Sequence, residues 1–438
     1  MGLFTTLNTG VSGLNANSVA MNVIGDNIAN VNTTGFKSSR AAFEDILAQN
    51  IIGSAGTTQL GHGAILVGIN MNYEQGTFEN TTSVTDLAIN GQGFFVVRDS
   101  ESRENLFTRS GQMFMSDQGY LVNSGGLRLQ GYNADSDGDL GSILEDINIP
   151  TGSTPPSKTT SFSISANLSA DTEVETDSTR QIDTSQVYFN YEDLEEVSDF
   201  STTQQIYDSL GESHDVTLYF QKVSENEWTF TAVAPSEGIV APDPSKVTGD
   251  ATALATGTLV FNPDGTLNAE TSVISDEVAW GNFKGAEAQA VVLDFSEEGS
   301  LTHYGDQDST VTATSQDGYS AGYMSFMNIE RDGSVVGIYS NGQRRTLAQV
   351  ALATFQSVQG LERRGGNLLG ATGESLDAVI AAAGTGGRGG ISSNSLESSN
   401  VDLESEFVHM IATQLGYQAN SRVISTTNEM LQQLLQLA

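Results

Sequence analysis

The chain has 438 residues and a formal net charge of −36 at pH 7, with 54 acidic and 18 basic residues. Such a charge opposes binding to a phosphate backbone, so nucleic acid is not an expected partner. There is no cysteine, which excludes disulfides and thiolate metal sites. No Lys or Arg precedes Lys37 and no apolar run has the length of a membrane span, so we expect neither a cleaved signal peptide nor membrane insertion.

The N-terminal residues carry apolar side chains at every seventh position, which predicts an amphipathic helix of the coiled-coil type. The series are Phe4 and Val11; Leu7, Leu14, Met21 and Ile28; and Ile24 with Val31. The segment ends in Asn27, Asn30 and Asn32, which are poor helix formers. This ending needs an explanation beyond helix propensity.

Farther along, the seven-residue period gives way to strands separated by turns. Residues 86–99, DLAINGQGFFVVRD, place an Asn90-Gly91 turn between apolar runs. Residues 328–355 hold Asp-Gly and Asn-Gly turns at the spacing of a three-stranded meander. We expect these two distant stretches to form one β domain.

The middle of the chain, residues 146–312, is also strand-like, as in HDVTLYFQKVSENEWTFTAVA at 214–234. It holds 29 acidic against five basic residues, a net charge of −24. This excess predicts a solvated β insert on an exposed face. Residues 50–63 and 381–395 are rich in Gly, Ser and Thr, which predicts flexible connections.

A second helix with a seven-residue period is predicted at the C-terminus. Its series is Leu403, Met410, Tyr417, Ile424 and Leu431, supported by Phe407, Leu434 and Leu435. Ser399 and Asn400 are predicted to cap its start, and the acidic Asp402, Glu404 and Glu406 follow at the positive end of the helix dipole. We expect the two terminal helices to pack on each other and on other copies.

Together these patterns predict an α+β fold with nested insertions, in which a terminal α-helical coiled coil flanks mainly β domains. The expected parts are residues 1–35 with 396–438 as the helical coiled-coil domain, 36–75 with 366–395 as a connector, 76–145 with 313–365 as an inner β domain, and 146–312 as an acidic outer β domain.

Several segments contain specific residue motifs in addition to their apolar periodicity. Residues 22–47, NVIGDNIANVNTTGFKSSRAAFEDIL, resemble the N-terminal signature of the bacterial flagellar rod and hook family, with matches at Asn27, Ala29, Asn30 and from Gly35 to Lys37. The segments DLAINGQGFFVV and FTRSGQMFMSDQGYLV, and the ending from LESSNVDLESEF onward, look like other signatures of this family. Within it, residues 339–369 and the large insert are most similar to hook rather than rod subunits.

The resemblance implies a structural subunit that assembles into a flexible helical tube, the flagellar hook, which passes motor torque to the filament. It implies an inner helical layer, a middle β domain and an outer β domain. It also implies export without a cleaved signal by the flagellar type III apparatus, an extracellular location, and partners in the rod, the hook cap and the hook–filament junction. In the family the Asn-rich segment lies where the inner helix ends, and its amides can satisfy backbone groups there and across subunits.

The resemblance and the heptads together predict a polymer interface on the terminal helices. Its expected residues are Leu7, Leu14, Met21, Asn27, Ile28, Asn30, Leu403, Met410, Tyr417, Ile424 and Leu431.

No catalytic, cofactor or metal site is predicted. The four histidines lie in unrelated contexts without a zinc-binding pair. DSDGD at 135–139 lacks the glycine and glutamate that a calcium loop needs at its sixth and twelfth positions, so it predicts a polar turn. Two alternatives to a hook subunit stay open: a distal rod protein, and an acidic secreted adhesin or enzyme that works through the β insert.

Overall fold

The computed structural model describes residues 2–46, 49–53, 56–136, 138–150, 152–177, 180–184, 186–236, 249–268, 286–287, 291–295 and 301–437. The chain divides into two compact units. The first unit comprises Met1–Thr151, Ser325–Ile338 and Arg344–Ala438, and the second comprises Gly152–Met324 and Tyr339–Gln343.

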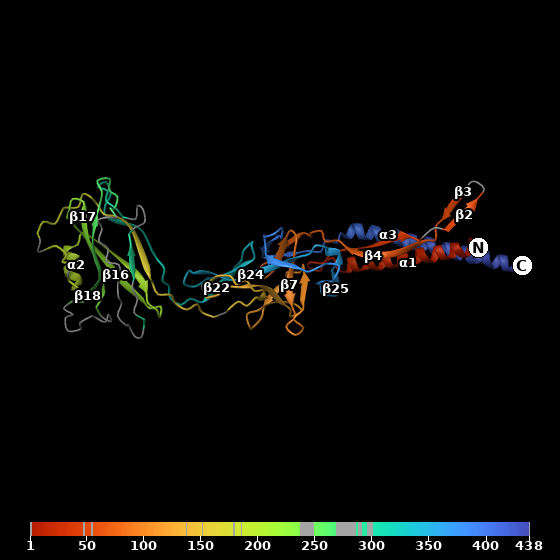
Figure 1. Cartoon of the computed structure of the whole chain (residues 1–438), viewed down its shortest axis with the longest axis horizontal. Coiled ribbons are helices and arrows are strands. Elements are labelled where there is room, and N and C mark those ends of the chain that lie inside the picture. Colours follow the sequence, from red (N-terminus) through yellow and green to blue (C-terminus); the bar gives the residue numbers. More distant parts are fainter. Residues whose placement is uncertain are drawn as a thin grey trace. The chain divides into compact units, whose positions relative to one another are not determined.

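The first unit contains the two long helices, α1 (Gly2–Ala29) and α3 (Leu403–Leu437), which lie side by side (Figure 1). The predicted terminal helices are therefore confirmed, within a mainly β chain. The strands before the second unit are β1 Ser39–Asp45, β2 Gln49–Gly53, β3 Gly56–Leu60, β4 Ala64–Met71, β5 Phe78–Asn80, β6 Leu87–Asn90, β7 Phe94–Arg98, β8 Asn105–Thr108, β9 Met113–Met115, β10 Leu121–Asn123, β11 Arg128–Asn133 and β12 Glu145–Asp146. Those after it are β22 Met324–Ile329, β23 Ser334–Tyr339, β24 Arg344–Thr354, β25 Glu362–Gly365, β26 Leu368–Gly370, β27 Val379–Ala382, β28 Gly390–Ser393 and β29 Ser395–Glu397, with a 3₁₀ turn at Val358–Gly360.

Most strands of this unit form one twelve-stranded sheet with the path β22-β23-β24-β11-β7-β8-β26-β25. The predicted meander is confirmed as β22, β23 and β24. Its last strand pairs with β7, Leu352 opposite Phe95, so the two distant stretches do form one β domain. Gly91 and Gly93 have φ values of +117° and +131°, and the turn they make separates β6, which pairs with β28, from β7.

The buried end of this sheet is an aromatic cluster. Phe94 and Phe107 both pack edge-on against Phe355, with ring centroids 6.0 and 4.7 Å apart. Tyr73, from the segment that follows β4, adds a further edge contact to Phe94. The cluster thereby attaches the β1–β4 hairpin to the twelve-stranded sheet.

Two local predictions were wrong. The cap of α3 is Asp402, whose Oδ1 accepts the Glu404 N–H, because Asn400 uses its side chain to bind the backbone of Ser38 instead. The predicted flexible connections contain strands: β2 pairs with β3 within 49–60, and 381–395 contains β28 and the first residue of β29. Between β27 and β28, Gly384, Gly386 and Gly387 have positive φ values and form a turn rather than an irregular linker.

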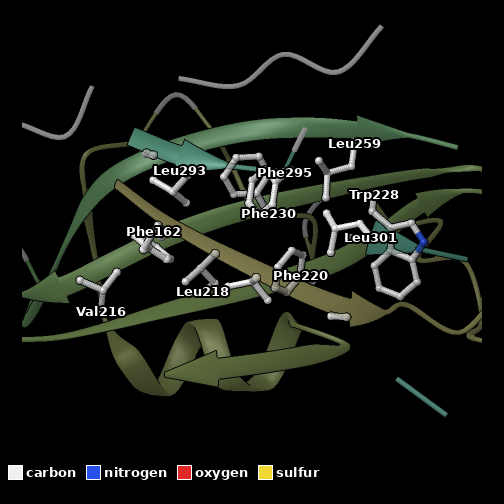
Figure 2. Packing of buried hydrophobic residues seen from close by; sticks show 14 of the residues in the cluster. Phe162, Val216, Leu218, Phe220, Trp228, Phe230, Leu259, Leu293, Phe295 and Leu301 are labelled. Carbon is white, nitrogen blue, oxygen red and sulfur yellow. The ribbon is translucent and has the colours of Figure 1, made fainter. Parts of the chain in front are cut away.

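The second unit is a pair of β-sheets with a buried core between them. One sheet has the order β14-β18-β17-β16-β15; the other joins β13 to β19, β20 and β21. Figure 2 shows the core, in which Phe230 packs edge-on against Phe295 with 5.3 Å between the ring centroids. The elements are β13 Ser161–Asn167, β14 Tyr188–Phe189, α2 Tyr191–Val197, β15 Phe200–Tyr207, β16 Ser213–Ser224, β17 Glu227–Pro235, β18 Ala251–Val260, β19 Val292–Asp294, β20 Leu301–Thr302 and β21 Thr310–Gln316.

Among the described residues, no helix is both long and apolar enough to cross a membrane. The described part of the chain also brings no three His, Asp or Glu side chains together in an arrangement that could hold a metal ion.

Candidate assembly surface of the terminal helices

Glycines of each terminal helix lie against side chains of the other helix. A Cβ atom on Gly13 would lie 2.6 Å from Nδ2 of Asn420, and one on Gly10 would lie 3.0 Å from Cγ1 of Ile424. On the opposite helix, a Cβ on Gly416 would lie 2.9 Å from Oδ1 of Asn17. A glycine inside a helix costs about 1 kcal/mol relative to alanine, and here it leaves room for a side chain of the facing helix.

Asn27 joins the end of α1 to the first strand and to α3. Its side chain is buried, accepts the Ser39 N–H at 2.9 Å and donates to the Ser39 carbonyl at 2.9 Å and to Oε1 of Glu406 at 3.1 Å. The Asn30 side chain donates to the Asp26 carbonyl at 2.9 Å, and this carbonyl also accepts the backbone N–H of Asn30 at 3.2 Å in the last turn of the helix. The asparagines at the end of the helix therefore bind backbone groups within the subunit.

A buried ion cluster lies directly beyond this helix end. Glu397, fully buried, contacts Lys37 Nζ at 2.5 Å and Arg109 at 3.2 Å, and its Oε1 also accepts the Gly76 N–H at 3.0 Å. Burial lowers the pKa of both Lys37 and Arg109, while Glu397 acts in the opposite direction. Because the three side chains come from distant parts of the chain, this cluster ties the helix ends to the β domain.

Arg363 makes a second, more exposed connection at the same place. Its guanidinium donates to the Lys37 carbonyl at 2.8 Å and to Oδ2 of Asp26 at 3.2 Å, and it lies 5.1 Å from the centre of the Phe36 ring. Residues next to the end of α1 are thus held by a hairpin more than three hundred residues away. The direction in which the helices leave the β domain is fixed by these contacts.

The face of α3 turned away from α1 is apolar and exposed. Phe407, Ile411 and Leu415 follow one another at four-residue intervals and are 49%, 58% and 61% exposed. At about 100° per residue they lie roughly opposite the face that contains Asn420 and Ile424. On α1, Phe4 and Val11, which belong to one heptad series, are exposed as well. The contact between the two helices therefore leaves apolar surface uncovered.

The residues predicted for the polymer interface occupy different environments in the single chain. Ile424 faces Gly10 within the subunit, and Asn27 is buried in the contacts described above. Leu403 and Tyr417 are exposed. Half-buried residues of the set are Leu7, Leu14, Met21, Ile28, Asn30, Met410 and Leu431.

Sequence reasoning missed the glycines of the helix pair and the Lys37–Arg109–Glu397 cluster. Gly10, Gly13 and Gly416 gave a usable signal, because glycine inside a predicted helix usually has a packing reason. The cluster gave none, since each charged residue stands alone in its own segment.

Four known protein families match successive segments of the chain. The matched descriptions are "Flagella basal body rod protein" for residues 7–37, "Flagellar hook protein FlgE/F/G D1 domain" for 88–167, "Flagellar basal body protein FlaE D2 domain" for 167–319, and "Flagellar basal body rod FlgEFG protein C-terminal" for 392–437.

Curated relatives match over their full length. The chain is 34% identical to the flagellar hook protein FlgE of Salmonella typhimurium, over 98% of both chains, and 32% identical to that of Borreliella burgdorferi, over 99% of this chain and all of the other. Among solved structures, the Helicobacter pylori flagellar hook protein FlgE2 has the same fold with a TM-score of 0.52, at 17% identity, and covers 73% of this chain and all of its own.

Paired terminal helices with uncovered apolar faces, attached to nested β domains, define an axial protein of the bacterial flagellum. The relatives narrow the class further: the chain belongs to the flagellar hook protein family. This is a family of structural proteins, and the full-length matches favour the hook over the distal rod protein and over a secreted adhesin or enzyme.

Proposed function

We propose that the chain polymerises through its terminal helices into the hook, a helical tube that bends while it transmits torque to the filament. The observation that carries this proposal is the exposed apolar row of Phe407, Ile411 and Leu415, on the face of α3 opposite α1. Burying an apolar side chain of this size contributes about 1.5–3 kcal/mol, so covering the row by another copy would drive assembly.

The interface includes this row and the exposed or half-buried residues among the eleven predicted from the heptads, whereas Ile424 and Asn27 make their contacts within the subunit. The four-part division into helical domain, connector, inner β domain and acidic outer domain describes the layers of the tube. The rod, the hook cap and the hook–filament junction proteins are the proposed neighbours at its ends. The subunit reaches this extracellular position through the flagellar type III apparatus, without a cleaved signal peptide.

A double variant, Phe407→Asp with Ile411→Asp, tests the proposal in cells and with the secreted protein. We expect secretion and helix content by circular dichroism to stay as in the wild type, while electron microscopy finds no tubes and the cells do not swim. Ile143→Asp is the matched control, because Ile143 is 69% exposed in a loop of the β domain. Tubes of normal length from the double variant would contradict the proposal.

A further inference from the structure

A cavity of about 250 Å³ lies beside the buried ion cluster, entirely within the first unit. The charged residues that line it are three bases, Lys37, Arg109 and Arg363, and one acid, Asp26. The chain as a whole has 54 acidic and 18 basic residues, so the walls of this cavity reverse the charge balance of the protein.

The positive charge at the cavity is not cancelled by its ion pairs. Glu397 is shared between Lys37 and Arg109, and Asp26 pairs with Arg363 at 3.2 Å. Among these five side chains, two carboxylates therefore face three cations, and one positive charge is left over. The pKa of Lys37 reflects this surplus, because burial lowers it most and the positive charge of Arg109 lowers it further, against the opposing effect of Glu397.

Arg109 has donors left for a ligand. Its Nη1 donates to Oε2 of Glu397 at 3.2 Å and its Nη2 to the Gly91 carbonyl at 2.9 Å, so the described residues use two of its five N–H groups. Its Nε is buried without a hydrogen-bond partner among the described residues, in a side chain that is only 7% exposed. A buried charged donor without a partner is costly, and a carboxylate can satisfy a guanidinium through two parallel hydrogen bonds.

The apolar walls of the cavity lie against these charges. The guanidinium carbon of Arg109 is 5.3 Å from the centre of the Phe94 ring, and that of Arg363 is 5.1 Å from the centre of the Phe36 ring. The other apolar residues that line the cavity are Met71, Leu368 and Leu369. A phosphate or sulfate dianion would place charged oxygens against such side chains, whereas an aliphatic carboxylate combines a single charge with a carbon chain. A cavity of about 150 Å³ in another protein already holds benzene, so this one has room for a few carbon atoms.

We propose that this cavity binds an aliphatic monocarboxylate, with the carboxylate on Arg109 and Arg363 and the carbon chain against Phe36 and Phe94. A free short-chain acid and the side chain of a glutamate on a second copy both offer this chemistry. An occupant would hold the segment that follows α1 to the β25–β26 hairpin, which carries Arg363. Because the cavity lies within one chain, the site does not depend on the proposed assembly.

Thermal unfolding of the monomeric full chain tests the site with butyrate as the probe. A ligand that binds only the folded protein raises its melting temperature, so butyrate should raise that of the first unit by about 3–6 °C at roughly ten times its dissociation constant. Butyramide has nearly the same shape without the charge and should have no effect, and inorganic phosphate at equal ionic strength should have a smaller effect than butyrate. The fluorescence transition of Trp228, in the second unit, should stay unchanged. The absence of a butyrate effect, or an equal effect of butyramide or phosphate, would overturn the proposal.

A carboxylate built into the cavity gives an independent test. Leu368, on β26, lines the cavity and is half-buried, so Leu368→Glu and Leu368→Gln lose the same apolar packing and differ in charge alone. We expect Leu368→Glu to melt about 3–10 °C above Leu368→Gln and to lose the response to butyrate, because its own carboxylate occupies the site. In a chain with a net charge of −36, a further acid has no general reason to stabilise the fold. A Leu368→Glu variant that melts at or below Leu368→Gln would contradict the site.

Assembled tubes distinguish the two sources of the carboxylate. Saturation-transfer NMR measures butyrate binding to the monomer and to tubes that electron microscopy has checked. If the ligand is a free acid, the tubes should bind butyrate as the monomer does. If a glutamate of a second copy fills the cavity, the tubes should bind several-fold less butyrate, and butyrate should slow their growth. A monomer that binds butyrate but never forms tubes would contradict the assembly alone and still support the site.

Discussion

Replacing Glu397 by glutamine removes one negative charge from the buried cluster while keeping nearly the same shape. Lys37 and Arg109, with side chains 5% and 7% exposed, would then face no carboxylate. Removing one partner of a buried ion pair costs about 3–5 kcal/mol, because the other charge stays out of water. At about 2–4 °C per kcal/mol for a unit of this size, the first unit should melt about 6–20 °C lower.

Calorimetry measures this loss of stability in the monomeric chain. Tryptophan fluorescence, recorded in parallel, serves as the reference for the second unit. Trp228 is fully buried in the second unit, so its fluorescence reports that unit alone and should not shift. Glu362→Gln is the matched control, since Glu362 pairs with Arg364 at 3.2 Å on the surface and exposed pairs contribute about 0–1 kcal/mol. If the melting temperature of Glu397→Gln lies within about 1–2 °C of that of the control, the buried cluster contributes no more than an exposed ion pair. It then does not hold the helices to the β domain.

Combined replacement of the cluster distinguishes lost charge pairing from lost packing. Glu397→Leu with Lys37→Met and Arg109→Met removes all three charges and keeps the side-chain volume. Because well-packed apolar residues often replace a buried ion pair without loss, we expect this variant to recover most of the stability. A triple variant as unstable as Glu397→Gln would contradict the electrostatic explanation.

Three further changes act on single contacts of the first unit. Asn27→Ala should cost about 1–3 kcal/mol, because buried backbone groups of β1 lose their partner, and hydrogen exchange of that strand should accelerate; unchanged exchange would count against the role of this amide. Gly13→Ala should destabilise the helix pair by its clash with Asn420, and Gly25→Ala, where nothing lies within 4 Å, should stabilise by up to about 1 kcal/mol; equal melting shifts would exclude the close-approach explanation. The Tyr73 hydroxyl is buried and has no partner among the described residues, and burial raises its pKa to about 12. Because the unfolded chain ionises this hydroxyl near pH 10 and the folded chain only near 12, the stability of the wild type falls as the pH rises from 10 toward 12. Tyr73→Phe should melt at or above the wild-type temperature and lose less stability in that pH range, and a variant that melts lower at neutral pH would show that the hydroxyl has a partner.

The amino-acid sequence by itself determined the elements and their nesting. Heptads at both ends specify amphipathic helices because a repeated apolar position is a local property of the chain. The Asp-Gly and Asn-Gly turns specify the meander because only a few residue types accept their backbone angles. The family signatures at residues 22–47 and at the C-terminus led from these elements to the hook.

The tertiary structure decided which residues meet. In the helix pair, Gly13 faces the Asn420 side chain and Gly10 faces Ile424, and the seven-residue period alone does not specify which residues face each other. Asn400 is drawn from the expected cap to the backbone of Ser38, so Asp402 replaces it. Glu397 gathers charges from segments 288 and 360 residues away, and no local pattern can specify such pairing because it depends on the path of the whole chain.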